Sequence, residues 1–137
     1  MLIRAASVDE VLPLRALVLR DGGPLDSARF DEDEAALHVV VLDPDVVACA
    51  TAFPAPREGE PGAWRIRGVA VHPERQGSHL GQSVVRSVMV ESGAESFWCT
   101  ARISAVGFWE RLGFAAEEPE PYSMPHGGLH HTMFLRA

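Results

Sequence analysis

Apolar positions along the chain repeat at two different spacings, and these spacings predict which segments are helices and which are strands. Apolar residues three and four positions apart predict three helices, from Ser7 to near Arg20, from Leu80 to Gly93 and from Ile103 to Leu112. Runs rich in β-branched and aromatic residues predict strands at 2–5, 37–42, 46–53, 63–71, 97–100, from 114, and 130–135. Glu10, three residues after Ser7, has the spacing of a capping box.

The order of these elements predicts an α/β fold with a mixed central sheet flanked by helices. The turn Asp43-Pro44-Asp45 joins two strands into an antiparallel hairpin. Residues 24–35 are acidic and are expected to form a solvated loop with at most one helical turn, and residues 117–128 are expected to be irregular. No repeat or linker divides the chain, so residues 1–137 are expected to form a single domain.

Composition and charge narrow the classes of function. The 137 residues carry 12 basic and 19 acidic side chains, a net charge of −7. Such a surface repels nucleic-acid phosphates and anionic lipids, so we expect no nucleic acid and no membrane as partners. No apolar run approaches the length of a membrane span and no signal peptide is recognisable, which predicts a soluble cytoplasmic protein. Cys49 and Cys99 lie in apolar runs and are expected to be buried, reduced thiols.

The segment from Arg67 to Gln82 carries the clearest chemical signal. A predicted strand, a short polar loop and the glycine-containing start of a helix follow one another. The first turn of a helix offers free backbone N–H groups and a positive dipole end, and glycine lets the backbone approach a phosphate closely. Gly77 and Gly81 fit neither the P-loop nor the dinucleotide fingerprint. The residues alone leave two interpretations open, a phosphate cradle and an ordinary helix start.

Two motifs together resemble the GNAT superfamily of acyl-CoA-dependent N-acyltransferases, and the resemblance covers nearly the whole chain. Residues 76–81, Gln-Gly-Ser-His-Leu-Gly, fit the family's Arg/Gln-x-x-Gly-x-Gly/Ala loop, with His79 where glycine is usual. Residues 102–114 align with the family pattern Asn-x-x-Ala-x-x-x-Tyr-x-x-x-Gly-Phe, with Arg102 and Trp109 in place of the asparagine and tyrosine.

The resemblance implies an N-acetyltransferase that binds acetyl-CoA in a cleft where the third and fourth sheet strands part. The backbone of Val69, Ala70 and Val71 would meet the pantetheine amides. The pyrophosphate would be held by the loop residues Gln76, Gly77, Ser78, His79, Leu80, Gly81 and Gln82. The primary amine of a small molecule would attack the thioester carbonyl directly, with proximity supplying much of the rate.

Two positions that the family uses for proton transfer are not filled in the usual way. Residues 64–71 contain no acid that could take the amine's proton. Trp109 replaces the tyrosine that would protonate the thiolate, and because an indole N–H is not a useful acid, Trp109 is expected to pack against the cofactor. The candidates for the missing acid or base are His130, Tyr122 and Ser104, together with His126 and His131.

For His130, a strand histidine bonded to backbone is the competing interpretation. A zinc site at His126, His130 and His131 is disfavoured because no acid accompanies them, and no metal is expected.

Three arginines are relevant to the choice of acceptor, and two of them lie on the predicted strand 63–71. Arg65 and Arg67 alternate with apolar residues, and arginine is seldom buried without a partner. They either pair with acids such as Asp31 or Glu34, or bind a ligand. If Arg67 and Arg102 face the cleft, they favour an acceptor that carries both an amine and a carboxylate.

Two further hypotheses compete with a transferase. One is a CoA-binding sensor that has lost catalysis, motivated by Trp109 and the strand without an acid. The other is a nucleotide-binding protein that uses the same loop. The sequence does not decide the oligomeric state, and a homodimer is left open.

Overall fold

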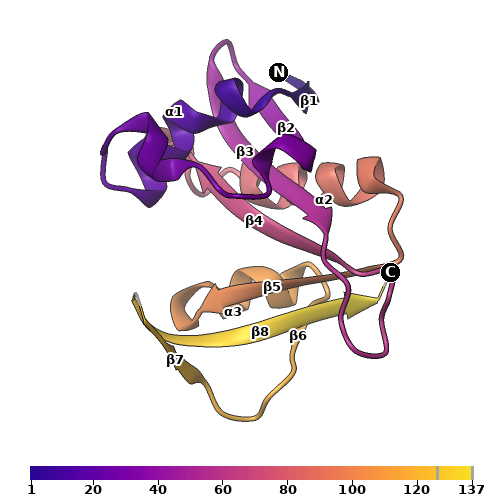
Figure 1. Cartoon of the computed structure of the whole chain (residues 1–137). Helices are drawn as coiled ribbons and strands as arrows, with labels where there is room; N and C mark the ends of the chain where they lie inside the picture. The colour runs from indigo at the N-terminus through magenta and orange to yellow at the C-terminus, as the bar shows by residue number, and fades with distance from the viewer. Residues whose placement is uncertain (126, 137) are drawn as a thin grey trace. The chain divides into compact units, whose positions relative to one another are not determined.

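The computed structural model describes residues 1–125 and 127–136, and the chain divides into two compact units (Figure 1). The first unit comprises residues 1–54 and 66–93, and the second comprises residues 55–65 and 94–137. Strand β4 (Trp64–Val71) begins in the second unit and ends in the first. The expectation of a single domain over residues 1–137 stays a prediction.

The strands follow the order β1 (Leu2–Ala6), β2 (Leu37–Leu42), β3 (Val46–Pro54), β4, β5 (Ser96–Arg102), β8 (Gly128–Arg136) and β6 (Ala115–Ala116). β7 (Tyr122–Met124) pairs with β8. β4 and β5 run parallel, whereas β1–β2, β2–β3 and β5–β8 are antiparallel. This order confirms the predicted α/β fold with a mixed sheet.

The first unit places one helix on each face of its strands. Its elements are β1 (Leu2–Ala6), α1 (Val8–Leu19), β2 (Leu37–Leu42), β3 (Val46–Pro54), the end of β4 and α2 (Leu80–Ser92). Consecutive residues 39–41 of β2 and 48–50 of β3 are fully buried, so both faces of these strands are covered. Val40 and Cys49 pack with Val11 and Leu14 of α1, while α2 also contacts β2 and β3. By the alternation of side chains along a strand, α1 and α2 therefore cover opposite faces.

The segment between α1 and β2 corrects one prediction. It forms two short 3₁₀ helices, Leu25–Ala28 and Asp33–Ala35, rather than at most one helical turn. Ala28 and Asp33 are buried, so the expectation of a solvated acidic loop is wrong at Asp33. The physical reason is a buried partner for its carboxylate, described below.

The second unit is smaller, with one short α-helix, antiparallel strands and the parallel pairing of Trp64 and Arg65 with β5. Its elements are β5 (Ser96–Arg102), a 3₁₀ turn (Ile103–Ala105), α3 (Val106–Arg111), β6 (Ala115–Ala116), β7 (Tyr122–Met124) and β8 (Gly128–Arg136). The predicted helix over 103–112 is thus shorter and begins as a 3₁₀ turn. β7 lies inside the stretch expected to be irregular, and it is held by pairing with β8. None of the described helices is long and apolar enough to span a membrane.

Candidate functional site

The loop between β4 and α2 is shaped by its backbone. Residues 73–75 form one 3₁₀ turn, and the His72 ring accepts a hydrogen bond from the Glu74 N–H at 3.1 Å. Gly77 has φ 84°, a left-handed conformation that glycine adopts without steric cost. The chain then enters α2, whose first-turn N–H groups have no partner within the helix. The loop therefore presents backbone donors and the positive end of a helix, as an anion site requires.

His79 is the loop position where glycine is usual, and the backbone explains that preference. The residue stands just before α2 with φ 63° and ψ 15°, in the left-handed region. A residue with a Cβ loses about 1–2 kcal/mol in this conformation, and glycine does not. The imidazole is exposed, and the His79 carbonyl accepts hydrogen bonds from the N–H and the hydroxyl of Ser83, each at 3.1 Å. This chain keeps the left-handed position and carries the strain of a side chain there.

Polar contacts hold the loop against neighbouring parts of the first unit. Arg75 Nη2 lies 2.8 Å from Asp43 Oδ2 in the β2–β3 turn, and this hydrogen bond holds the pKa of Asp43 below its usual value. Gln76 Nε2 donates to the Val71 carbonyl at 3.5 Å. The first four residues of the predicted cradle, 76–79, are exposed, whereas Leu80 and Gly81 are buried and Gln82 is half-buried. The loop is thus anchored at both ends and open in its middle.

The strand before the loop takes a left-handed conformation at Gly68. Its φ is 66°, and a Cβ built there would lie 2.8 Å from Arg15 Nε and 2.9 Å from Phe30 Cε2. Only glycine allows this approach. Of the residues predicted to meet pantetheine, Ala70 is buried beside α1, and Val69 and Val71 are half-buried. Their backbone role toward CoA stays a prediction.

Beside Gly68 lies a buried ion pair that the hydrophobic pattern did not predict. Arg15 is fully buried, and its Nη1 and Nη2 donate to the two Asp33 carboxylate oxygens at 2.8 and 2.9 Å. The Phe30 N–H donates to Asp33 Oδ2 at 2.9 Å. Burial favours the protonated form of Asp33, but hydrogen bonds from Arg15 and Phe30 outweigh it, so the pKa of this carboxyl is lowered. The missed signal was Arg15 itself, four residues after Val11 on the core-facing stripe of α1.

His38 and Thr51 complete this network. His38 Nε2 lies 2.9 Å from the Asp33 carbonyl oxygen, which can only accept, so Nε2 carries the proton. Nδ1 then accepts from the Thr51 hydroxyl at 2.7 Å, and the Thr51 oxygen accepts from Arg15 Nη2 at 2.6 Å. Burial, with the charge of Arg15, lowers the pKa of His38, although the bond to the Asp33 carbonyl acts in the opposite direction. The hydrogen bonds therefore hold His38 in its neutral form.

Arg67 pairs within the first unit. Its Nη1 lies 3.0 Å from Glu32 Oε1, and its guanidinium carbon lies 3.9 Å from the centroid of the Phe30 ring. The partner is thus an acid of the 24–35 segment, but neither Asp31 nor Glu34. A role of Arg67 toward the acceptor stays a prediction.

The other two arginines belong to the second unit. Arg65 Nη2 donates to Thr100 Oγ1 at 3.1 Å, and the guanidinium lies over the Trp98 ring. Two side chains of β5, Thr100 and Trp98, thus hold the Arg65 guanidinium. Arg102 is exposed at the end of β5, and its predicted binding role is likewise untested.

The candidate acids and bases also lie in the second unit. His130 is buried, and its Nδ1 lies 3.1 Å from the Gly128 carbonyl, the arrangement of a strand histidine bonded to backbone. The register of β7 and β8 places Tyr122 opposite His130, and the Tyr122 hydroxyl lies 2.9 Å from Thr132 Oγ1. Ser104 is exposed in the 3₁₀ turn before α3. Their catalytic roles stay predictions.

His126 lies outside the described residues. Within residues 1–125 and 127–136, no three His, Cys, Asp or Glu side chains form a group that could hold a metal.

Trp109 is a core residue of the second unit. Its ring packs edge-on against Phe108 and Phe114, with centroids 5.2 and 5.0 Å away. Only 6% of the residue is exposed. Packing is thus its observed role, and its contact with the cofactor stays a prediction.

Both cysteines are free and buried, as expected. Burial raises the pKa of Cys49 to about 12 and raises that of Cys99 as well. Neither thiol ionises near neutral pH, so neither is a nucleophile.

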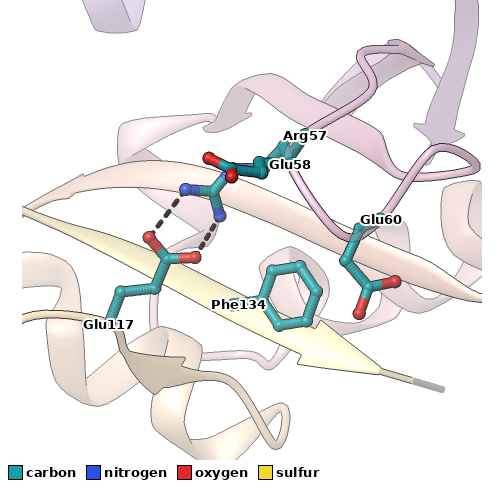
Figure 2. Close-up of a pocket in the computed structure, with 5 residues that line it drawn as sticks. All are labelled: Arg57, Glu58, Glu60, Glu117 and Phe134. Atoms are coloured by element: carbon teal, nitrogen blue, oxygen red, sulfur yellow. Dashed lines mark hydrogen bonds and ion pairs between the residues drawn. The ribbon is translucent and has the colours of Figure 1, made fainter.

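A pocket of about 260 Å³ lies in the second unit, and none of the predicted site residues lines it (Figure 2). It is lined by Arg57, Glu58, Glu60, Glu117 and Phe134. Arg57 donates to both carboxylate oxygens of Glu117, and Arg136 pairs with Glu60. The pocket's charges are therefore largely matched by partners of this unit.

Comparison with known proteins decides the family. The model of the Acetyltransferase (GNAT) family matches residues 9–114. The chain belongs to the GNAT acetyltransferase family. An uncharacterized N-acetyltransferase of Bacillus subtilis, YitI, is 27% identical over 140 residues, which covers 96% of this chain and 93% of YitI.

Solved structures agree with the GNAT fold. An aminoglycoside 6'-N-acetyltransferase in complex with coenzyme A has a TM-score of 0.77 at 15% identity, covering 99% of this chain and 97% of that one. Escherichia coli ElaA has a TM-score of 0.72 at 18% identity, covering 97% of each chain. These findings confirm the resemblance seen in the motifs, and they assign this GNAT chain to a class of enzymes that use acyl-CoA and an acceptor.

Proposed function

We propose that this GNAT protein transfers an acetyl group from acetyl-CoA to the primary amine of a small molecule. The observation that carries the proposal is the loop of residues 76–82, where Gly77 and His79 take left-handed conformations directly before α2. Backbone N–H groups at a helix start bind a pyrophosphate without any cationic side chain. The CoA complex of an aminoglycoside acetyltransferase with this fold supports the same ligand class.

The first unit would supply most of the contacts that bind acetyl-CoA. Gln76 to Gln82 would hold the pyrophosphate, and the backbone of Val69 to Val71 would bond the pantetheine amides. In the second unit, Trp109 would contribute a packing surface. Two free, buried cysteines fit a reducing compartment, and the cytoplasm is the location that we propose.

Direct acetyl transfer requires mainly that the side chains position the amine beside the thioester. The amine nitrogen attacks the thioester carbonyl carbon, the new C–N bond forms, the C–S bond breaks, and the proton lost by the amine balances the thiolate that leaves. An alkylamine with a pKa of about 10.4 is mostly protonated at neutral pH, so a proton acceptor or a water chain is needed. His130, Tyr122 and Ser104 remain the candidates for proton transfer.

A CoA-binding sensor is the second candidate function. It is favoured by the buried indole of Trp109 at the position of the usual tyrosine, because an indole cannot protonate the leaving thiolate.

Thiol release from acetyl-CoA, followed across a panel of small amines, separates the two functions. We expect release that depends on the amine and saturates with it. CoA binding without amine-dependent release would support the sensor, and absence of CoA binding would refute both.

A further inference from the structure

Strand β4, which carries the proposed pantetheine contacts, has no acid of its own, but the fold brings one to it. Glu32, from the segment between α1 and β2, places its Oε1 3.0 Å from Nη1 of Arg67 on β4. Arg67 lies two residues before Val69, where the proposed contact with acetyl-CoA begins. A carboxylate and a guanidinium thus stand together close to that stretch of β4.

This pair is held in place by buried neighbours. Asp33, the residue after Glu32, is clamped by the bidentate hydrogen bonds of Arg15. The Phe30 ring lies under the guanidinium groups of both Arg15 and Arg67, with distances of 4.1 and 3.9 Å to its centroid. The absence of a Cβ at Gly68 allows this packing. The residue after Glu32 and the ring beneath Arg67 are therefore held by contacts with Arg15.

The pair also remains open to a ligand. The side chains of Arg67 and Glu32 are 31% and 37% exposed, whereas those of Arg15 and Asp33 are 0% and 3% exposed. One hydrogen bond joins the first pair, and a guanidinium has five donors while a carboxylate has about four acceptor positions. Both groups can bind a second charged partner without separating from each other.

We propose that Glu32 and Arg67 together recognise an acceptor with an amine and a carboxylate on neighbouring atoms, as in an α-amino acid. The ammonium would bind the free Glu32 oxygen, and the carboxylate would bind the remaining donors of Arg67. This recognition rests on the proposed transfer from acetyl-CoA, because the bound amine would then lie beside the thioester.

The experiment compares L-amino acids with their decarboxylated amines as acceptors, in wild type, Glu32→Gln and Arg67→Lys. Asp26→Asn is the matched control, since Asp26 is an exposed acid of the same segment that pairs with Arg29. Wild type should prefer amino acids by about tenfold or more in kcat/KM. Glu32→Gln should raise the acceptor KM about ten- to a hundredfold and leave the KM for acetyl-CoA unchanged. Arg67→Lys should remove the preference for the carboxylate, and the control should match wild type.

Two measurements distinguish a failure of the acceptor site from a failure of the proposed function. Calorimetric titration with CoA comes first, because a chain that does not bind CoA refutes the proposed function and the acceptor site with it. Thermal melts check that each variant is folded, and Glu32→Asp, which keeps the charge, should retain the preference in part. If the chain binds CoA but uses decarboxylated amines equally well, or acetylates no amino acid, the assignment of Glu32 and Arg67 is overturned.

Discussion

Replacing Asp33 with asparagine removes the counterion of a fully buried arginine. The Asp33 carboxylate accepts two hydrogen bonds from Arg15 and one from the Phe30 N–H, and only 3% of the residue is exposed. Breaking a buried pair from one side costs about 3–5 kcal/mol, because the remaining charge is left uncompensated. A domain of this size is stable by roughly 5–15 kcal/mol, so Asp33→Asn should remove a large share of that stability.

Urea unfolding followed by circular dichroism measures this loss directly. Asp26→Asn is the control, because the Asp26 side chain is 90% exposed and its loss should change stability by less than about 0.5 kcal/mol. The double variant Arg15→Met, Asp33→Leu removes both charges and should recover most of the loss. A loss below about 1 kcal/mol in Asp33→Asn, or a double variant no more stable than the single one, would refute the buried-pair argument.

Three further predictions concern Gly68, His79 and His38. Gly68→Ala should destabilise the fold by about 2 kcal/mol or more, because the new Cβ meets Arg15 Nε at a left-handed position; chemical denaturation checks this. His79→Gly should raise stability by about 1 kcal/mol and keep CoA binding, as judged by melts and calorimetry. The pKa of His38 is lower in the folded protein than in the unfolded chain, so the unfolded chain takes up the proton first as the pH falls. Stability should therefore fall as pH drops below about 6.5. His38→Gln should flatten this dependence in thermal melts between about pH 5 and 8.

The role assigned to Trp109 gives a prediction about turnover. Trp109→Tyr supplies a group that can give a proton, so it should keep or raise the rate of thiol release, whereas Trp109→Ala should destabilise the second unit by opening a cavity. A loss of activity in Trp109→Tyr with CoA binding unchanged would show that the indole has a specific role.

Much of the fold and the cradle was predictable because their signals are local. Runs of β-branched residues predicted the hairpin around Asp43, and the spacing of the glycines predicted the loop before α2. The buried network was not predictable in this way, since a charge between Leu14 and Ala16 has no local partner, and its counterion lies 18 residues away at Asp33. β7 was missed for a similar reason: it is a three-residue strand held by pairing with β8 rather than by its own pattern. Whether Arg67 faced an acid or a ligand also depended on tertiary contacts.

The most direct test of the central claim is calorimetric titration of CoA into wild type and Gly81→Asp. Gly81 is the second residue of α2 and is buried, so an aspartate there would bring a negative charge to the proposed pyrophosphate site. Val90→Asp adds the same charge at a position of α2 that is 79% exposed and far along the helix, and it serves as the control. We predict that wild type and Val90→Asp bind CoA and that folded Gly81→Asp does not. Equal affinity in all three proteins would contradict the assignment of this loop.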